Sequence, residues 1–458
     1  MALHYSSISE ISRLLRSGGI TSTALTQLML ERIERLNPLL NAFVTVAAEE
    51  ALAAACEADR RLGAGEWLGP LHGVPVAVKD NMATKGIRTT CGSKLYADWV
   101  PDHDANVVGK LKEAGAIILG KAGTHELAYG TTSINPFFGR IANPWDTTRD
   151  PGGSSGGSAS AVAAGLAFAA LGTDTACSIR YPAHCCGIVG FKPSFGLVGT
   201  TGVLPLVRTM DHVGPLARNV EDAALIMQAI SGPDAQDPYS SGRQFVPLQG
   251  EVGTIAGTRI GIARQFFFDG EPEIIEFVDR AIGELEKQGA VIVEIDSGGI
   301  DVSLEMSGLV FAEAYALHAQ ALAAHPGDFS SELQEKLGRK SRISASDYIR
   351  AQHERLRLRA LMAEMMQQCD ALVAPSATIM PAPFDQRPEG YDHHASKNAT
   401  VFNLSGQPSI SIPCGLTKAG LPVGMMISGR LDHDAELLRI AHLAECALAP
   451  FEAYPALH

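Results

Sequence analysis

Two serines and one lysine, each beside a glycine-rich or strand-like segment, are the residues of this chain best suited to chemistry. Ser154 lies in the Gly/Ser block 150–158, Ser178 follows downstream of it, and Lys79 ends the apolar run 74–78. A serine hydroxyl becomes a good nucleophile only when a neighbouring base takes its proton. A lysine supplies that base when burial lowers its pKa, because desolvation disfavours the ammonium. The three side chains therefore predict a serine hydrolase with a lysine base.

Each of these signals also has a purely structural interpretation. An acidic residue follows Lys79, as at an ion-paired strand end, and a Gly/Ser block is typical of a flexible turn before a helix. The pattern Gly152-x-Ser154-x-Gly156 also fits the nucleophile elbow of α/β-hydrolases, which needs a strand leading into the serine. Pro151 argues against such a strand, so we set the elbow aside.

The elements that must position these residues alternate between short apolar runs and amphipathic stretches. Helical spacing predicts helices in the first sixty or so residues and over 106–113, 219–230 and 273–288. Short strands between helices indicate an α/β fold with a large, mostly parallel mixed sheet covered by helices on both faces. The predicted strands span residues 74–78, 116–119, 168–171, 188–191, 260–263, 291–295, 371–374, 409–413 and 425–428.

The 458 residues would suffice on size for two or three domains, but no low-complexity linker or repeat divides them. We predict a single domain over 1–458. Within it we expect N-terminal helices over 1–65, a catalytic core over 66–230 and the remainder of the sheet over 231–458. A helix-dominated insert at 300–369 is expected to cap the sheet.

Charge and cysteine content argue against several classes of protein. The net charge of 37 − 50 = −13 argues against nucleic acid or an anionic membrane as the main partner, because phosphate binding needs a basic face. The chain has no uninterrupted apolar stretch of about 18 residues, so no membrane span is predicted. The N-terminus also lacks a signal-peptide pattern. The eight cysteines are scattered without metal-ligand or CxxC spacing, which indicates reduced thiols, no metal site and a cytoplasmic protein.

Several motifs, in order along the chain, resemble the amidase signature family. The similarity covers nearly the whole chain and rests on segments 73–81, 152–158, 172–175, 178–180, 186–193, 214–222, 402–408 and 420–424. The resemblance implies a Ser-cis-Ser-Lys triad in which Ser178 is the acylated nucleophile. Ser154, preceded by a cis peptide bond, would relay the proton to Lys79 as base. Ser155 and Thr173 match positions that hydrogen-bond the triad, and no cofactor is implied.

The same resemblance implies an oxyanion hole made by the backbone N–H groups of Thr175, Ala176, Cys177 and Ser178. Members of the family usually have two glycines directly before the nucleophile, whereas this chain has Ala176 and Cys177. Because a backbone N–H donates whatever side chain it carries, we expect the hole to survive and the substrate preference to change. Asp174 and Arg180 are expected to hold the loop rather than to touch substrate.

By analogy with the family, the substrate pocket would be lined by Tyr129, Arg208, Met306, Val310, Phe311 and Val401. These side chains are mostly apolar, which favours an aryl or alkyl amide, although Arg208 could instead bind a substrate carboxylate. We therefore expect an amidase that hydrolyses the C–N bonds of small-molecule amides, with carbamates (urethanes) and esters as further substrates. It would work without nucleic acid or membrane, and a homodimer is the one assembly considered.

Two alternatives stay open at this point. One is the glutaminase subunit of a tRNA-dependent amidotransferase, which resembles the same family and works with partner subunits. The other is a catalytically silent interaction protein of the same fold. The presence of Lys79, Ser154 and Ser178 together argues against the silent protein.

Overall fold

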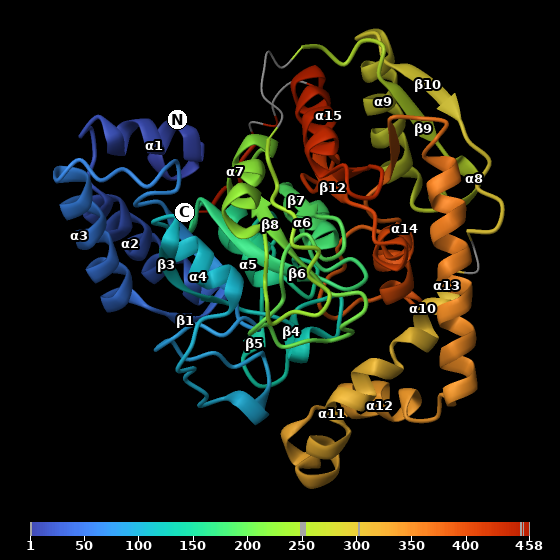
Figure 1. Cartoon of the computed structure of the whole chain (residues 1–458), viewed down its shortest axis with the longest axis horizontal. Helices are drawn as coiled ribbons and strands as arrows, with labels where there is room; N and C mark the ends of the chain where they lie inside the picture. Colours follow the sequence, from blue (N-terminus) through green and yellow to red (C-terminus); the bar gives the residue numbers. More distant parts are fainter. Residues whose placement is uncertain (1, 248–252, 301–302, 449–450, 452, 458) are drawn as a thin grey trace.

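A single large sheet runs through the computed structural model, which describes residues 2–247, 253–300, 303–448, 451 and 453–457. Residues 301 and 302 of the predicted insert lie outside this described part. Helices cover both faces of the sheet (Figure 1), so the predicted α/β class is confirmed. The sheet order is β1-β3-β2-β6-β8-β7-β12-β13-β11-β9-β10.

The strands of this sheet match the apolar runs closely, with two additions. They are β1 (Phe43–Val46), β2 (Pro75–Lys79), β3 (Ile117–Ala122), β6 (Ala169–Asp174), β7 (Val189–Lys192), β8 (His212–Ala217), β9 (Arg259–Ile262), β10 (Val291–Glu294), β11 (Ala371–Pro375), β12 (Ser409–Leu416) and β13 (Pro422–Ser428). A separate small pair, β4 (Ile134–Asn135) and β5 (Gly139–Arg140), stands beside it. Parallel pairing joins β3, β2 and β6 at one end and β11, β9 and β10 at the other. The strands between these two blocks pair antiparallel, which makes the sheet mixed.

The two strands that the apolar runs do not predict are β1 and β8. β1 lies within the N-terminal stretch predicted to be helical and pairs antiparallel with β3 at the sheet edge. β8 contains Gly214 and Pro215, which are poor strand formers. Antiparallel partners on both sides, β6 and β7, nevertheless hold β8 in the sheet. Tertiary pairing thus overrides local propensity at this point.

The helices lie mainly in the stretches between strands, and side-chain caps mark the start of some of them. They are α1 (Ile8–Arg16), α2 (Ser22–Leu40), α3 (Ala48–Gly63), α4 (Asn106–Glu113), α5 (Gly156–Ala163), α6 (Arg180–Cys186), α7 (Val220–Ile230), α8 (Arg264–Phe267), α9 (Pro272–Lys287), α10 (Ser303–Val310), α11 (Ala312–Ala324), α12 (Ser331–Lys340), α13 (Ala345–Met365), α14 (Tyr391–Ser405) and α15 (Asp434–Ala447). Short 3₁₀ turns lie at Leu3–Tyr5, Lys94–Tyr96, Glu126–Ala128 and Pro326–Asp328. Ser7 and Glu10 form a capping box at the start of α1, as does Ser344 with Asp347 at α13. In the described part of the chain, no helix is long and apolar enough to cross a membrane.

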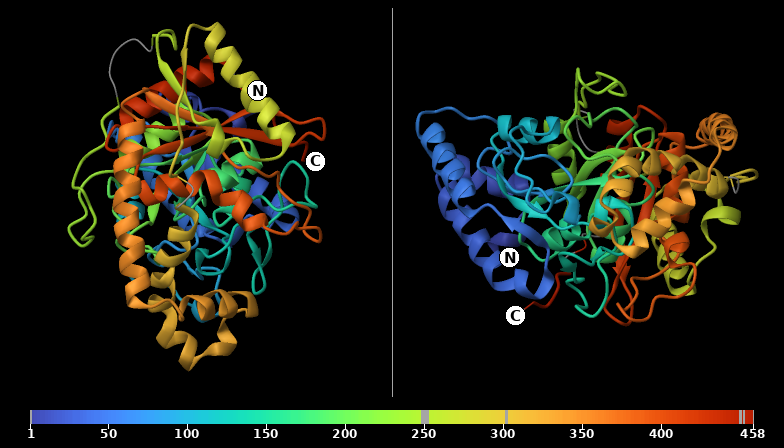
Figure 2. Two further views of the ribbon diagram at one scale, coloured as in Figure 1. Left: turned by 90° about the vertical axis from the view of Figure 1, so that its right-hand side faces the viewer. Right: turned by 90° about the horizontal axis from the view of Figure 1, so that it is seen from below.

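The three predicted segments contribute to one sheet, because β1, β2 and β9 belong to the N-terminal, central and C-terminal segment respectively. Their exact bounds stay a prediction. Helices α10 to α13 form a group at one side of the molecule, and α13 runs along its outer edge (Figure 2). Helix α5 and the start of α6 lie in the middle of the structure, where the Gly/Ser block and the segment of Ser178 meet.

Candidate active site

The amine of Lys79 lies among hydroxyl groups at the buried end of β2. Its Nζ atom donates to Ser154 Oγ at 2.8 Å, Ser155 Oγ at 2.9 Å and Thr173 Oγ1 at 2.7 Å. Burial lowers the pKa of Lys79 from 10.5 to about 7. The lysine is therefore partly neutral near pH 7, as a base must be.

The structure does not support the alternative in which Lys79 is ion-paired at the end of a strand. The neighbouring Asp80 carboxylate turns to Thr90, whose backbone N–H donates to it at 3.1 Å. Lys79 and Asp80 are both fully buried. Their side chains bond to different partners, since Lys79 is the last residue of β2 and Asp80 begins the turn that follows.

The Gly/Ser block is a buried, tightly packed loop rather than a flexible turn. Residues 151–158 are all buried, and the peptide bond between Gly153 and Ser154 is cis. A Cβ on Gly153 would lie 2.7 Å from the carbonyl carbon of Thr131, so only glycine fits there. The Ser154 carbonyl accepts hydrogen bonds from Thr124 Oγ1 at 2.9 Å and from the His125 backbone N–H at 3.3 Å. These contacts hold the Ser154 hydroxyl against Lys79.

Ser178 lies in the segment between β6 and α6, which packs against the Gly/Ser block. This residue is nearly buried, with 7% of its surface exposed, and its carbonyl accepts the Ser155 backbone N–H at 3.3 Å. Ser155 Oγ also donates to the Thr173 carbonyl at 3.2 Å. The fold thus brings together Lys79, Ser154, Ser155, Thr173 and Ser178 from three separate stretches of sequence.

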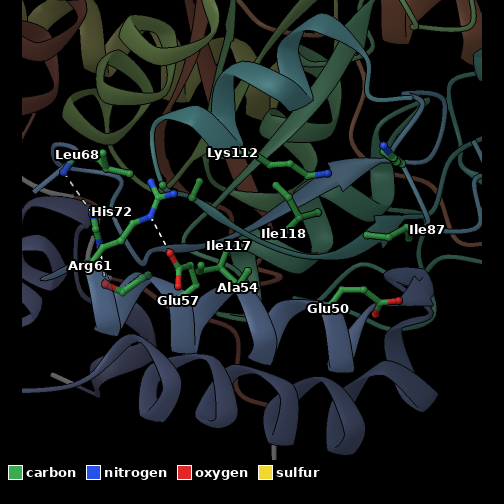
Figure 3. Close-up of a pocket in the computed structure, with 14 residues that line it drawn as sticks. Glu50, Ala54, Glu57, Arg61, Leu68, His72, Ile87, Lys112, Ile117 and Ile118 are labelled. Carbon is green, nitrogen blue, oxygen red and sulfur yellow. Dashed lines mark hydrogen bonds and ion pairs between the residues drawn. The ribbon is translucent and has the colours of Figure 1, made fainter. Parts of the chain in front are cut away.

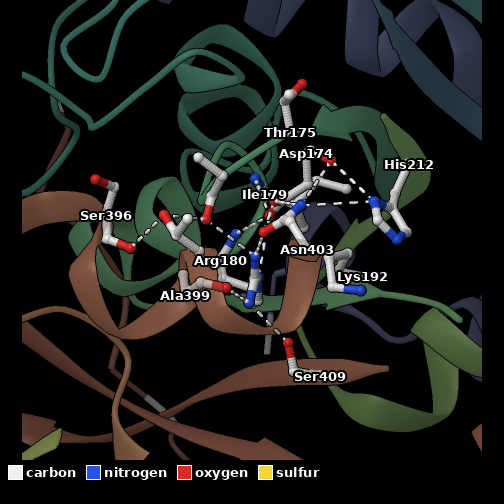
Figure 4. A network of polar contacts seen from close by, with 12 residues as sticks. Asp174, Thr175, Ile179, Arg180, Lys192, His212, Ser396, Ala399, Asn403 and Ser409 are labelled. Carbon is white, nitrogen blue, oxygen red and sulfur yellow. Dashed lines mark hydrogen bonds and ion pairs between the residues drawn. The ribbon is translucent and has the colours of Figure 1, made fainter. Parts of the chain in front are cut away.

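A buried ion pair holds the loop that carries Ser178 (Figure 4). Asp174 Oδ1 and Arg180 Nη2 are 2.9 Å apart, and neither side chain is exposed. Burial alone would raise the pKa of Asp174, but the Arg180 guanidinium and hydrogen bonds hold it well below its usual range. The Ile179 backbone N–H donates to the same carboxylate at 3.0 Å. As expected, Asp174 and Arg180 bond to the loop itself.

Sequence reasoning assigned no role to the downstream residues that complete this network. Asn403 on α14 donates to Asp174 Oδ1 at 2.8 Å, and Arg180 Nη1 donates to Ser409 Oγ at 2.8 Å (Figure 4). On the other side of the loop, Thr175 Oγ1 donates to Asp211 at 2.6 Å. The motif around Asn403 was the only sequence signal for any of these contacts.

The carbonyl groups around Ser178 turn toward protein donors. The Ala176 carbonyl accepts Arg180 Nη2 at 3.2 Å, and the Cys177 carbonyl accepts the Tyr181 backbone N–H at 2.8 Å. In a trans peptide the N–H of the next residue points opposite to the carbonyl. The N–H groups of Cys177 and Ser178 therefore point away from Arg180 and from the Tyr181 N–H.

The two residues that replace the family's glycines occupy different environments. Ala176 is half-buried, whereas Cys177 is 1% exposed. Burial, with the Asp174 charge nearby, raises the pKa of Cys177 well above its usual value. Cys177 therefore acts as a packed apolar side chain and not as a reactive thiolate.

The predicted pocket residues differ in their contacts and exposure. Tyr129 and Phe311 stack with ring centroids 5.3 Å apart, while Met306, Val310 and Val401 are buried within α10 and α14. Arg208 is exposed and borders a small cavity that is also lined by Thr175 and by Thr173, a hydrogen-bond partner of Lys79. The substrate roles of all six stay predictions.

A larger surface cavity of about 350 Å³ lies between α3 and β3, away from the triad (Figure 3). Arg61 and His72 in its wall already have partners, since Arg61 Nε bonds Glu57 Oε1 at 3.0 Å and His72 Nε2 contacts the Ala58 carbonyl at 2.8 Å. The cavity contains none of the predicted site residues. Within the described ranges, no group of three or more His, Cys, Asp or Glu side chains is arranged to hold a metal ion.

The chain is similar to known proteins of one family along most of its length. The Amidase family model matches residues 24–438. A glutamyl-tRNA(Gln) amidotransferase subunit of Moorella thermoacetica is 37% identical over 97% of both chains. A solved protein complex that reveals the evolutionary origins of an s-triazine catabolic enzyme matches with a TM-score of 0.92, 31% identity and coverage of 98% of this chain and 100% of that chain. A solved glutamyl-tRNA(Gln) amidotransferase subunit of Thermotoga maritima gives a TM-score of 0.82 and 31% identity over 96% and 94% of the two chains.

These relatives contradict one expectation drawn from composition. The acidic net charge argued against nucleic acid, and the resemblance implied a small-molecule amide or carbamate as partner, whereas the relatives are named as subunits of a glutamyl-tRNA(Gln) amidotransferase. The charge of one chain says nothing about RNA held by another subunit of the same assembly, so the inference from charge was wrong. The names of the relatives also give no support to carbamate hydrolysis.

The amidase signature resemblance is confirmed by the family match, by relatives of similar length and by solved structures. The buried lysine and its hydroxyl partners have the contacts that the resemblance implied, and their catalytic roles stay predictions. The chain belongs to the amidase family and is an enzyme that acts on carbon–nitrogen bonds other than peptide bonds.

Proposed function

We propose that this chain is the glutaminase subunit of a tRNA-dependent amidotransferase. Its site would hydrolyse the side-chain amide of glutamine, and the ammonia would be used by a partner subunit. The observation that carries the chemistry is the buried amine of Lys79 among three hydroxyls, with a pKa of about 7. Similarity to glutamyl-tRNA(Gln) amidotransferase subunits over 97% of this chain supports the assignment to such an assembly.

In the first half of the reaction, Ser178 Oγ attacks the amide carbon and loses its proton to Ser154 Oγ. Ser154 passes its own proton to the neutral Lys79 Nζ, 2.8 Å away. When the tetrahedral intermediate collapses, the C–N bond breaks and the same relay returns the proton to the leaving nitrogen, which departs as ammonia. In the second half, water attacks the ester and its proton passes through Ser154 to Lys79; as the C–O bond to Ser178 breaks, the relay returns the proton to Ser178 Oγ and the acid is released.

The negative charge that develops on the amide oxygen needs donors that are already in place. The N–H groups of Cys177 and Ser178 are suitable, because the carbonyls that precede them are engaged by Arg180 and Tyr181. The buried Asp174–Arg180 pair keeps these carbonyls where they are. Replacing glycines by Ala176 and Cys177 leaves this backbone arrangement possible.

A two-part experiment tests the proposal. The purified chain is first treated with a fluorophosphonate, and an adduct on Ser178 is expected in the wild type and absent in Ser178→Ala. Ammonia release from glutamine is then measured for the chain alone and with the partner subunits and glutamyl-tRNA(Gln), which should stimulate it. Turnover of other amides with none of glutamine, in the complete assembly, would exclude the glutaminase while retaining the amidase.

A further inference from the structure

The small hairpin of β4 and β5 presents one buried hydroxyl to the Gly/Ser block. Ser133 directly precedes β4 and is fully buried. Its neighbour on the hairpin, Asn135, anchors the turn by donating to the Gly92 carbonyl at 2.6 Å and to the Thr124 carbonyl at 3.2 Å. Ser133 has a φ of +55°, a left-handed conformation that residues other than glycine seldom take. Such a conformation persists only where its surroundings fix it, and it is found most often at functional sites.

The Ser133 hydroxyl bonds the backbone on both sides of Ser154. It donates to the Gly152 carbonyl at 2.9 Å and accepts the Gly156 backbone N–H at 3.1 Å. The same oxygen lies 3.4 Å from the Ser154 carbonyl oxygen. A hydroxyl has one hydrogen and two lone pairs, so one side chain can hold a donor and an acceptor of the same loop. The two partners stand two residues before and two residues after the relay serine.

The Gly/Ser block approaches Ser133 as closely as a glycine allows. A Cβ on Gly156 would lie 2.4 Å from Ser133 Oγ and 2.7 Å from its Cβ. Contacts that short do not occur between real side chains, so the lack of a Cβ at Gly156 is what lets the Ser133 hydroxyl reach the backbone N–H. The fit between hairpin and block is therefore specific to this pair of residues.

The bond to Gly156 also explains an unusual feature at the start of α5. The first N–H groups of a helix have no partner within it, and a serine directly before the helix commonly accepts one of them. Ser155 occupies that position, yet its side chain caps no N–H of α5. Its hydroxyl instead accepts the Lys79 amine at 2.9 Å and donates to the Thr173 carbonyl at 3.2 Å. Ser133 supplies an acceptor to the helix in its place.

We propose that Ser133 is a positioning residue of the triad, because its hydroxyl caps α5 in place of Ser155 and fixes the backbone on both sides of Ser154. The Ser155 hydroxyl is thereby left to Lys79. Ser133 acts through these two serines and has no step of its own in the reaction. The inference deepens the proposed function, on which it rests for the roles of Ser154 and Lys79.

Loss of the Ser133 hydroxyl should change the ionisation of Lys79. In Ser133→Ala the Gly156 N–H loses its acceptor, and the hydroxyl placed to turn toward the start of α5 is that of Ser155. When it turns, the Lys79 ammonium loses one of its hydrogen-bond acceptors. Because an acceptor favours the charged amine, its loss lowers the pH at which Lys79 becomes neutral.

The rate of Ser178 labelling by a fluorophosphonate, followed across pH, tests the proposal. Ser133→Ala should react about tenfold or more slowly than the wild type at the high-pH plateau, since a small displacement of a catalytic group is costly. Its midpoint should lie at lower pH than that of the wild type. The carboxylates whose charges act on Lys79, Asp174 and Asp211, are kept in the variant. A loss of overall stability alone would therefore leave the midpoint in place.

Two further variants separate the hydroxyl from its surroundings. Ser133→Gly also lacks the hydroxyl but adopts a φ of +55° without strain, so it should share the slower rate and the lower midpoint. The matched control is Ser160→Ala, which removes another buried hydroxyl, one that donates from α5 to the Ala142 carbonyl at 3.0 Å. It should keep the wild-type rate and midpoint. An unchanged midpoint in Ser133→Ala, a wild-type profile in Ser133→Gly or an equal shift in Ser160→Ala would each overturn the proposal.

The same measurements separate this proposal from the proposed function. A wild type that is not labelled at Ser178 would overturn both. Normal labelling of the wild type without turnover of glutamine in the complete assembly would overturn the glutaminase alone. Normal labelling of the wild type with the same rate and midpoint in Ser133→Ala would overturn the positioning role alone.

Discussion

The ionisation of Lys79 offers the most direct test of the catalytic geometry. Burial lowers its pKa from 10.5 to about 7. The difference corresponds to roughly 5 kcal/mol by which the site disfavours the ammonium. Because the neutral amine is the base, labelling of Ser178 by a fluorophosphonate should rise about tenfold per pH unit below pH 7 and level off above it. At pH 6 only about one molecule in eleven would hold a neutral lysine.

The assay is the second-order labelling rate of Ser178 between about pH 5 and 9.5. Lys79→Met keeps the side-chain volume and removes the base, so the rate should fall by about 10²–10⁴-fold and lose its midpoint near pH 7. Thr173→Val is the matched variant, because it removes one acceptor of the Lys79 amine and should move the midpoint to lower pH. A wild-type rate that is flat from about pH 5 to 9, or that rises only above about pH 9, would refute the role given to Lys79.

Four shorter tests address the surrounding structure. The unfolded state binds more protons at Lys79 than the folded state between about pH 7 and 10.5, so wild-type stability relative to Lys79→Met should rise across that window in urea titrations. Ser154→Ala should lower Ser178 labelling by about 10²-fold or more with an unchanged midpoint of unfolding. Arg180→Met should cost about 3–5 kcal/mol of unfolding free energy, measured by urea titration, because Asp174 is left buried and unpaired. Iodoacetamide at about pH 8 should leave Cys177 unmodified in the folded protein, and mass spectrometry showing rapid alkylation there would contradict its burial.

Local patterns were enough to predict most elements of the fold. The run that becomes β2 is apolar up to its final lysine, so it could only be a buried strand or part of a buried helix, and its length decided for the strand. The start of α1 was also predictable from local sequence, because the side chains of Ser7 and Glu10 both bond the backbone of the first turn of that helix. β8 escaped prediction because its glycine and proline are held by two neighbouring strands and not by its own propensity.

The residues of the candidate site were likewise predictable from the sequence only in part. Lys79, Ser154 and Ser178 stand in distinctive local contexts, and those contexts carry the resemblance to the amidase signature family. Asp211 stands in no such context, and the motif around Asn403 does not say what Asn403 contacts, although both residues bond the nucleophile loop. Nothing near them in sequence indicates a contact with residues 36 or 229 positions away, because side chains of such separation meet only after the sheet has formed.

The sequence by itself thus determined the class of fold, the residue types of the triad and the order in which they occur, because propensity, apolar period and motif are local properties of a chain. Only the tertiary structure decided that Lys79 is buried among hydroxyls with its pKa near 7, since desolvation depends on every segment that packs around the amine. It likewise decided that Ser133, and not Ser155, accepts an N–H at the start of α5. A serine directly before a helix commonly caps it, and only the folded hairpin brings Ser133 to that place instead.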